Sequence, residues 1–139
     1  MKKTAEFQKL TRIVDANFNR AKEGLRVCED VCRYALDLKK ETRQLKDMRH
    51  ALTRIIEPLG IKGLLASRDI EGDIGRKSTK SEFKRADINA VFYANAQRVK
   101  ESTRVLEEIT KLINPRCAQS LKELRYQFYA IEQRMAVQS

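Results

Sequence analysis

Hydrophobic residues recur at three-and-four spacing through two long stretches of the chain. The first stretch carries them at Leu10, Ile13, Val14, Ala21, Val27, Cys28, Val31 and Ala35. The second stretch carries them at Ile88, Val91, Phe92, Val99, Val105, Leu106, Ile109, Leu112 and Ile113. Apolar residues at this spacing line one face of an α-helix. The pattern therefore predicts two long amphipathic helices, one from Thr4 to about Leu38 and one that ends at Asn114-Pro115.

A second helical stretch follows each long helix, at roughly 41–57 and 116–137. Asn114 is a favourable N-cap, and Pro115 fits the first helical position of the last helix. Each half of the chain therefore predicts an αα-hairpin. We expect an all-α protein in which two hairpins form a four-helix, bundle-like domain.

The two halves also share a polar motif. The motif Ala16-Asn17-x-x-Arg20-x-Lys22-Glu23-x-x-Arg26-Val27-x-Glu29-Asp30 recurs 78 residues later as Ala94-Asn95-x-x-Arg98-x-Lys100-Glu101-x-x-Arg104-Val105-x-Glu107-Glu108. A weaker echo pairs Leu45-Lys46-Asp47-Met48-Arg49-His50 with Leu121-Lys122-Glu123-Leu124-Arg125-Tyr126. We therefore predict a single domain, 1–139, with an internal repeat of 4–57 and 82–137 joined by a loop, 58–81.

The connecting loop lacks helical periodicity and holds four of the five glycines, Gly60, Gly63, Gly72 and Gly75. Loops longer than about 15 residues inside a compact domain tend to be functional or disordered. Its front half mixes apolar and acidic residues and is expected to be ordered. Its back half, 76–81, is basic and is expected to be mobile.

Composition narrows the class of protein. No stretch approaches 18 consecutive apolar residues, which excludes a membrane span, and the N-terminal residues form no apolar signal core, so we expect a cytoplasmic protein. The three cysteines, Cys28, Cys32 and Cys117, form no C-x-x-C pair and accompany a single histidine. Zinc and a disulfide framework are thereby disfavoured, and buried core thiols are expected.

The net charge of +10 indicates a partner that carries negative charge: nucleic acid, acidic lipid headgroups or phosphorylated metabolites. Acidic residues are interleaved throughout, and aromatic residues make up only 6% of the chain, without a stacking motif. This weakens the case for nucleic acid and favours a smaller anion.

The repeated asparagines and arginines are candidate ligand-binding residues. Asn17 and Asn95 fall on the apolar helix faces, with Arg20 and Arg98 at the borders. A buried amide without hydrogen bonds costs about 1–3 kcal/mol, so it needs a partner in the protein or on a ligand. One interpretation is a polar pocket between the halves. The alternative is that the asparagines bond each other or the backbone and only fix the helix register.

The charged residues of the motif lie on another face of each helix. Arg26 with Glu23 and Asp30, and their counterparts in the second half, have the three-and-four spacing of surface ion pairs. We expect such pairs along both helices. They contribute only a few tenths of a kcal/mol each.

The connecting loop carries a second candidate site. Asp69 and Asp73 flank Gly72 and follow Arg68, and Gly75 comes next. Mg²⁺ typically takes one or two carboxylates together with substrate phosphates, while glycine amides and an arginine can hold the phosphates. The alternative is a solvated turn in which the aspartates cap their own backbone. The sequence after Gly72 only superficially resembles a Walker P-loop, because Arg76 interrupts the Gly-Lys-Ser order.

His50 is the only histidine. On the second predicted helix it is a candidate base or phosphate ligand. A structural role is the alternative for a lone histidine.

Four motifs together resemble one small family, the compact phosphomethylpyrimidine kinase of bacterial thiamine biosynthesis, over roughly residues 10–135. They are Asp15-Ala16-Asn17-x-Asn19-Arg20-x-x-Glu23-Gly24-Leu25-Arg26-Val27-x-Glu29-Asp30, Arg49-His50, Leu65-Ala66-Ser67-Arg68-Asp69-x-x-x-Asp73-x-Gly75 and Ala94-Asn95-x-x-Arg98-x-x-Glu101-x-x-Arg104-Val105-Leu106-Glu107-Glu108. That family occurs alone or fused in front of thiamine-phosphate synthase. With no synthase sequence after it, this chain resembles the standalone form.

The resemblance implies ATP-dependent phosphorylation of 4-amino-5-hydroxymethyl-2-methylpyrimidine phosphate to its diphosphate. Carried over by motif, it implies that Arg68, Asp69 and Asp73 handle Mg²⁺ and the ATP phosphates, with Gly72 and Gly75 at the nucleotide. By the same motifs, the acceptor is held by Asn17, Arg20, Asn95, Arg98 and His50.

Two other functions stay open: a non-catalytic phosphate-ligand or partner-binding module that assists thiamine-phosphate synthase, and, supported by charge alone, a nucleic-acid binder. Helices of about 30 residues span some 45 Å, longer than one compact bundle of this size needs. We therefore expect self-association, with a homodimer as the simplest form.

Overall fold

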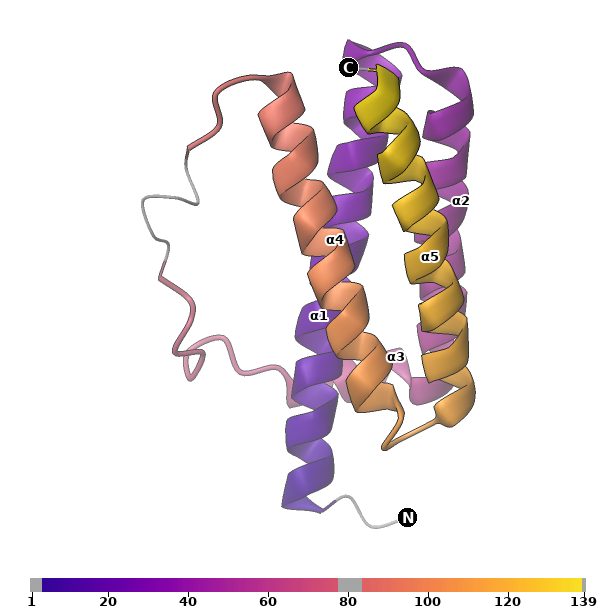
Figure 1. Cartoon of the computed structure of the whole chain (residues 1–139). Coiled ribbons are helices and arrows are strands. Elements are labelled where there is room, and N and C mark those ends of the chain that lie inside the picture. The colour runs from indigo at the N-terminus through magenta and orange to yellow at the C-terminus, as the bar shows by residue number, and fades with distance from the viewer. Residues whose placement is uncertain (1–3, 78–83, 139) are drawn as a thin grey trace.

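The computed structural model describes residues 4–77 and 84–138, and this part of the chain is all-α, without strands (Figure 1). Two helical segments make up the first hairpin: α1 spans Ala5–Asp30 and runs on into a π-helical turn, η1, at Val31–Ala35, and α2 spans Lys39–Ile56. The connection begins with a 3-10 turn, η2, at Glu57–Leu59 and a short helix, α3, at Ile61–Ser67. The second hairpin is made of α4 at Ile88–Thr110 and α5 at Pro115–Gln138.

The two long helices form the centre of the molecule. Helices α1 and α4 lie side by side and antiparallel along the most extensive helix interface, with α2 packed on α1 and α5 packed on α4 (Figure 1). A smaller contact between α2 and α5 closes the bundle. The predicted pair of hairpins is thus confirmed as a four-helix arrangement with α3 added at one end.

The helix boundaries agree with the hydrophobic pattern to within a few residues. The first helix is α-helical only to Asp30, and the backbone leaves helical geometry after η1, where Asp37 has a φ of 53°. Asn114 caps α5 as predicted, since its side-chain oxygen accepts a hydrogen bond from the Arg116 amide at 3.1 Å. The α4 helix begins at Ile88, because the Asp87 side chain caps it by accepting from the Ala90 amide at 2.8 Å.

The prediction of an entirely non-helical connection is wrong at α3. A helix of seven residues makes only two turns, which is too short to show a hydrophobic period in the sequence. Gly60, with a φ of 82°, redirects the chain into this helix, and Leu64 anchors it with 2% of its surface exposed. Of the stretch predicted to be mobile, residues 78–81 lie outside the described part of the chain.

Gly24 sets the close approach of the two central helices. A Cβ at this position would lie 2.8 Å from the Val99 side chain and 3.1 Å from the Asn95 carbonyl oxygen. Any larger residue would therefore push α4 away from α1. The core around this contact comes from all four long helices and includes Leu25, Leu52, Leu106, Leu121 and Phe128.

The weaker repeat echo is explained by the core. Leu45 and Leu121 are fully buried, and Met48 and Leu124 are nearly so, at matching places on α2 and α5. The three cysteines are reduced and buried, as the sequence predicted. In the described residues no helix has the length and apolar composition of a membrane span.

A buried ion pair repeats in both hairpins. Glu29 on α1 accepts from Arg49 on α2 at 3.0 Å, and Glu107 on α4 accepts from Arg125 on α5 at 2.7 Å. The two glutamate side chains are only 3% and 4% exposed. The repeated Glu and Arg residues thus join the two helices of each hairpin. The sequence pattern alone did not indicate this role.

The surface pairs expected along the helices are also present. Arg26 lies 3.6 Å from Asp30, and Arg104 lies 3.3 Å from Glu108. Both pairs have the spacing of four residues that brings side chains together on one helix face.

Candidate functional site

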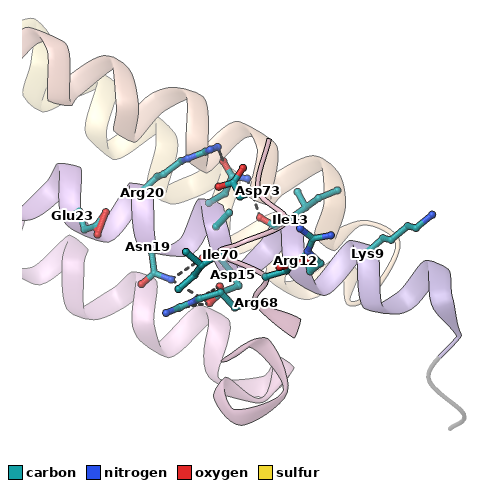
Figure 2. A pocket seen from close by; sticks show the side chains of 13 residues that line it. Lys9, Arg12, Ile13, Asp15, Asn19, Arg20, Glu23, Arg68, Ile70 and Asp73 are labelled. Carbon is teal, nitrogen blue, oxygen red and sulfur yellow. Dashed lines mark hydrogen bonds and ion pairs between the residues drawn. The ribbon is translucent and has the colours of Figure 1, made fainter. Parts of the chain in front are cut away.

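A cavity of about 630 Å³ opens between α1 and the segment that follows α3 (Figure 2). Its α1 wall runs from Lys9 to Glu23, and its other wall comes from Arg68, Asp69, Ile70 and Asp73. The size lies within the range of small-molecule sites in proteins. Five residues proposed from the sequence meet here: Asn17, Arg20, Arg68, Asp69 and Asp73.

Asp15 anchors the connecting segment to α1. The Arg68 guanidinium donates to both carboxylate oxygens of Asp15, at 2.8 and 2.9 Å, and Asn19 donates to one of them at 3.2 Å (Figure 2). The Asp15 side chain is 7% exposed. Hydrogen bonding to Asp15 raises the pKa of Arg68 above its ordinary value. The fork geometry fixes the direction in which the segment leaves α3.

Asn17 orients Arg20 at the next turn of α1. The Asn17 amide donates to the Ile13 carbonyl at 2.9 Å, and its side-chain oxygen accepts from Arg20 at 3.4 Å. The amide is buried, with 5% of the residue exposed, whereas Arg20 is exposed toward the cavity it lines. Asn17 therefore satisfies the hydrogen-bond requirement of its buried position within α1 and positions a cation.

The two aspartates of the connecting segment cap their own turns. Asp69 accepts from the Gly72 amide at 2.7 Å, and Asp73 accepts from the Gly75 amide at 2.9 Å. This is the solvated-turn alternative, and it leaves one carboxylate oxygen of each aspartate outside these bonds. A Cβ at Gly72 would overlap the Asp69 carboxylate, so a larger residue here would displace the Asp69 side chain from this bond. The two glycine amides point to the aspartates, a use that competes with binding of phosphate.

Among the described residues, no group of three or more histidines, cysteines and carboxylates is arranged to hold a metal ion. Two exposed carboxylates on one cavity wall nevertheless fit Mg²⁺, which takes its remaining ligands from water and phosphate.

Five candidate residues lie outside the lining of this cavity: Gly72 and Gly75 of the capped turns, and three residues on α2 and α4. Asn95 and Arg98 are on α4, and His50 is exposed on α2. Asn95 repeats the bond of Asn17 and donates to the Val91 carbonyl at 2.8 Å. The Asn95 backbone faces Gly24, and Asn17 lies seven residues, or about 10 Å, further back along α1. The prediction of one pocket enclosed by both asparagines is therefore wrong. The antiparallel packing of α1 and α4 separates the two side chains, and neither bonds the other.

Sequence reasoning gave no role to Asp15, Lys9 or Arg12, although all three line the cavity. A signal for Asp15 was present, because a carboxylate follows Val14 on the buried stripe and its repeat counterpart is Tyr93. A charged residue that breaks both the apolar stripe and the repeat is a candidate site residue. Lys9 and Arg12 carried no comparable signal.

The charged side chains of the cavity are balanced. Lys9, Arg12, Arg20 and Arg68 face Asp15, Glu23, Asp69 and Asp73. By charge alone the cavity therefore has no preference for an anion. A divalent cation held by Asp69 and Asp73 would turn the balance positive and favour phosphate groups.

Comparison with known proteins gives consistent relatives. The chain is 43% identical over 124 residues to thiamine-phosphate synthase of Synechocystis sp., a match that covers 88% of this chain and 35% of that protein. It is 39% identical over 134 residues to the thiamine-phosphate synthase of Thermosynechococcus vestitus, covering 96% of this chain and 37% of that protein. The thiamine-phosphate synthase of Rhodopirellula baltica is 39% identical over 127 residues, a match that covers 91% of this chain and 34% of that protein.

The chain thus spans about a third of the length of the curated relatives it matches. No solved structure matches it. The model of the ThiD2 family matches residues 12–134, nearly the whole chain, and the protein therefore belongs to the ThiD2 family.

Proposed function

We propose that this chain acts in thiamine biosynthesis as a kinase that phosphorylates 4-amino-5-hydroxymethyl-2-methylpyrimidine phosphate to the diphosphate, with ATP as donor. The relatives named thiamine-phosphate synthase contain a region like this chain within a longer protein, which supports a place in the same pathway. The observation that carries the proposal is the meeting of α1 and the 68–73 segment in one cavity with arginines and paired carboxylates.

Phosphoryl transfer asks the protein mainly for alignment and charge neutralisation. In the proposed site Asp69 and Asp73 hold Mg²⁺, which when bound neutralises phosphate oxygens. Arg20 and Arg68 bind phosphate oxygens from opposite walls of the cavity. Asp15 and Asn17 act through these two arginines as positioning residues.

The attacking atom in this reaction is an oxygen of the acceptor's phosphate. Because the second pKa of a phosphate monoester is about 6, that oxygen is already ionised at neutral pH. The step therefore needs no general base. A site without His50 is chemically sufficient, and we assign His50 no role in transfer.

The experiment is a coupled assay of ADP release with the pyrimidine monophosphate, ATP and Mg²⁺, followed by detection of the pyrimidine diphosphate. We expect Arg20→Gln, Arg68→Gln and Asp73→Asn each to reduce kcat/KM by at least about 100-fold, as loss of a transition-state charge contact does. The matched control is Arg98→Gln, the repeat counterpart of Arg20 outside the cavity, which should change kcat/KM less than about threefold. A folded wild-type protein that forms no diphosphate product would refute the kinase.

A second candidate is a non-catalytic module that binds a phosphorylated ligand for thiamine-phosphate synthase. It is favoured by the presence of a region like this chain within longer relatives named thiamine-phosphate synthase. Binding of the pyrimidine monophosphate without turnover, lost in Arg20→Gln, would identify this function. We also propose that the chain forms a homodimer, which light scattering tests directly.

A further inference from the structure

A second cavity, of about 440 Å³, lies between the end of α1, η1 and the first half of α2. Unlike the first cavity, it is strongly basic. Its charged lining consists of six cations, Arg26, Arg33, Lys39, Arg43, Lys46 and Arg49, and two acids, Glu29 and Asp47. The formal charge of the lining is therefore +4.

Part of this positive charge serves the fold. Arg49 is held by Glu29 at 3.0 Å, and Arg26 pairs with Asp30 at 3.6 Å. In the part of the chain that the structure describes, Lys39, Arg43 and Lys46 form no ion pair. Three neighbouring cations on one exposed helix face repel one another, which costs stability unless an anion binds them.

The internal repeat shows which of these cations the hairpin requires. The second hairpin keeps the buried pair as Glu107 and Arg125. It places Pro115 and Gln119 where the first has Lys39 and Arg43, and only Lys122 is kept, opposite Lys46.

The second hairpin also neutralises the position of Arg33. Its counterpart is Lys111, which pairs with Glu108 at 2.9 Å. A hairpin of this kind therefore folds without the unpaired basic face.

The backbone adds to the same electrostatic field. The α2 helix begins at Lys39, and its N-cap residue Leu38 provides no side-chain hydrogen bond to the first turn. The N-terminus of this 18-residue helix lies at the cavity, where the helix dipole favours negative charge. This contribution supplements the cationic side chains.

We propose that this basic cavity is a second anion site, which binds a small molecule through a diphosphate or triphosphate group. A single phosphate would engage only part of a lining with three unpaired cations spread over two turns of α2. The volume admits a small molecule, and the site shares no lining residue with the first cavity. The proposal is independent of the kinase activity, because the test measures binding.

The test is calorimetric titration of the whole chain with inorganic diphosphate at physiological ionic strength. In Arg43→Gln/Lys46→Gln we expect the dissociation constant to rise at least about tenfold, since two charge-assisted contacts are lost. The matched control is Lys122→Gln, the repeat counterpart of Lys46, which should change it less than about twofold. Arg20→Gln, in the first cavity, should leave this binding intact.

A second measurement does not depend on variants. In wild-type NMR spectra, diphosphate should shift the backbone amides of residues 39–46 and leave those of 116–122 in place. Absence of binding, equal weakening by Lys122→Gln, or shifts confined to α1 and the 68–73 segment would each overturn the proposal. In all three cases the kinase assay could still succeed, so the two proposals fail separately.

Discussion

The buried pair of Glu107 and Arg125 offers a sharp test of what holds each hairpin together. Arg125 donates to both carboxylate oxygens, at 2.7 and 3.2 Å, and the side chains are only 4% and 10% exposed. These hydrogen bonds raise the pKa of Arg125 above its ordinary value. Glu107→Gln keeps the size of the side chain, removes its charge and leaves a guanidinium without a counterion in the core.

Breaking one partner of a buried ion pair costs about 3–5 kcal/mol. The lower end applies here, because the Tyr129 hydroxyl still accepts from Arg125 at 2.9 Å. We therefore expect Glu107→Gln to reduce the free energy of unfolding by about 3 kcal/mol, a large fraction of the roughly 5–15 kcal/mol typical of a domain. Urea denaturation followed by circular dichroism measures the difference as a lower midpoint.

Two further variants separate charge from packing. Glu29→Gln makes the same change at the matching pair of the first hairpin. Among the described residues a single hydrogen bond, from Arg49, reaches that carboxylate, so a smaller loss is expected. The double variant Glu107→Leu/Arg125→Met removes both charges and should recover most of the lost stability. A loss below about 1 kcal/mol in Glu107→Gln would refute a structural role for the pair.

Three other outcomes follow from the fold. Asp15→Asn should release the segment after Arg68, seen as amide exchange of residues 68–77 that is faster by roughly tenfold, with little change in the exchange of α5. Gly24→Ala should destabilise the protein by about 1–3 kcal/mol, and Val99→Ala in that background should restore part of the loss, because the new methyl group overlaps the Val99 side chain. Burial raises the pKa of Cys32 to about 11, so Ellman's reagent should label this thiol only slowly at pH 8, and stability should fall as the pH rises from 9 to 11, where the unfolded thiol ionises first. Rapid labelling of the folded protein would contradict the burial.

The long helices were predictable because a hydrophobic period repeated over many turns leaves little ambiguity. The seven residues of α3 were not, since two turns carry no readable period. The repeated polar motif pointed to Asn17 and Arg20, which line the cavity on α1, but it also pointed to Asn95 and Arg98, which lie outside the cavity. The same residue types have different surroundings in the two halves, because a single segment connects the hairpins and its residues 68–73 lie against α1.

The ion pairs between the two helices of each hairpin were the other feature that could not be predicted from the sequence. Glu29 and Asp30 look alike in the motif, but one points into the core to meet Arg49 and the other remains at the surface. Which glutamate meets which arginine depends on the rotation of two helices about their axes. No spacing rule within one helix determines that rotation.

The route of the chain between the hairpins sets a minimum length for the connection. Helix α3 ends at the opposite end of the bundle from the start of α4, so the connecting segment, 68–87, must bridge a distance close to the length of α4 (Figure 1). That helix is about 34 Å long at 1.5 Å per residue, a span that roughly ten extended residues would bridge. About half of the residues of this segment are therefore needed to connect the two hairpins. Deletions within it should be tolerated only while at least that half remains.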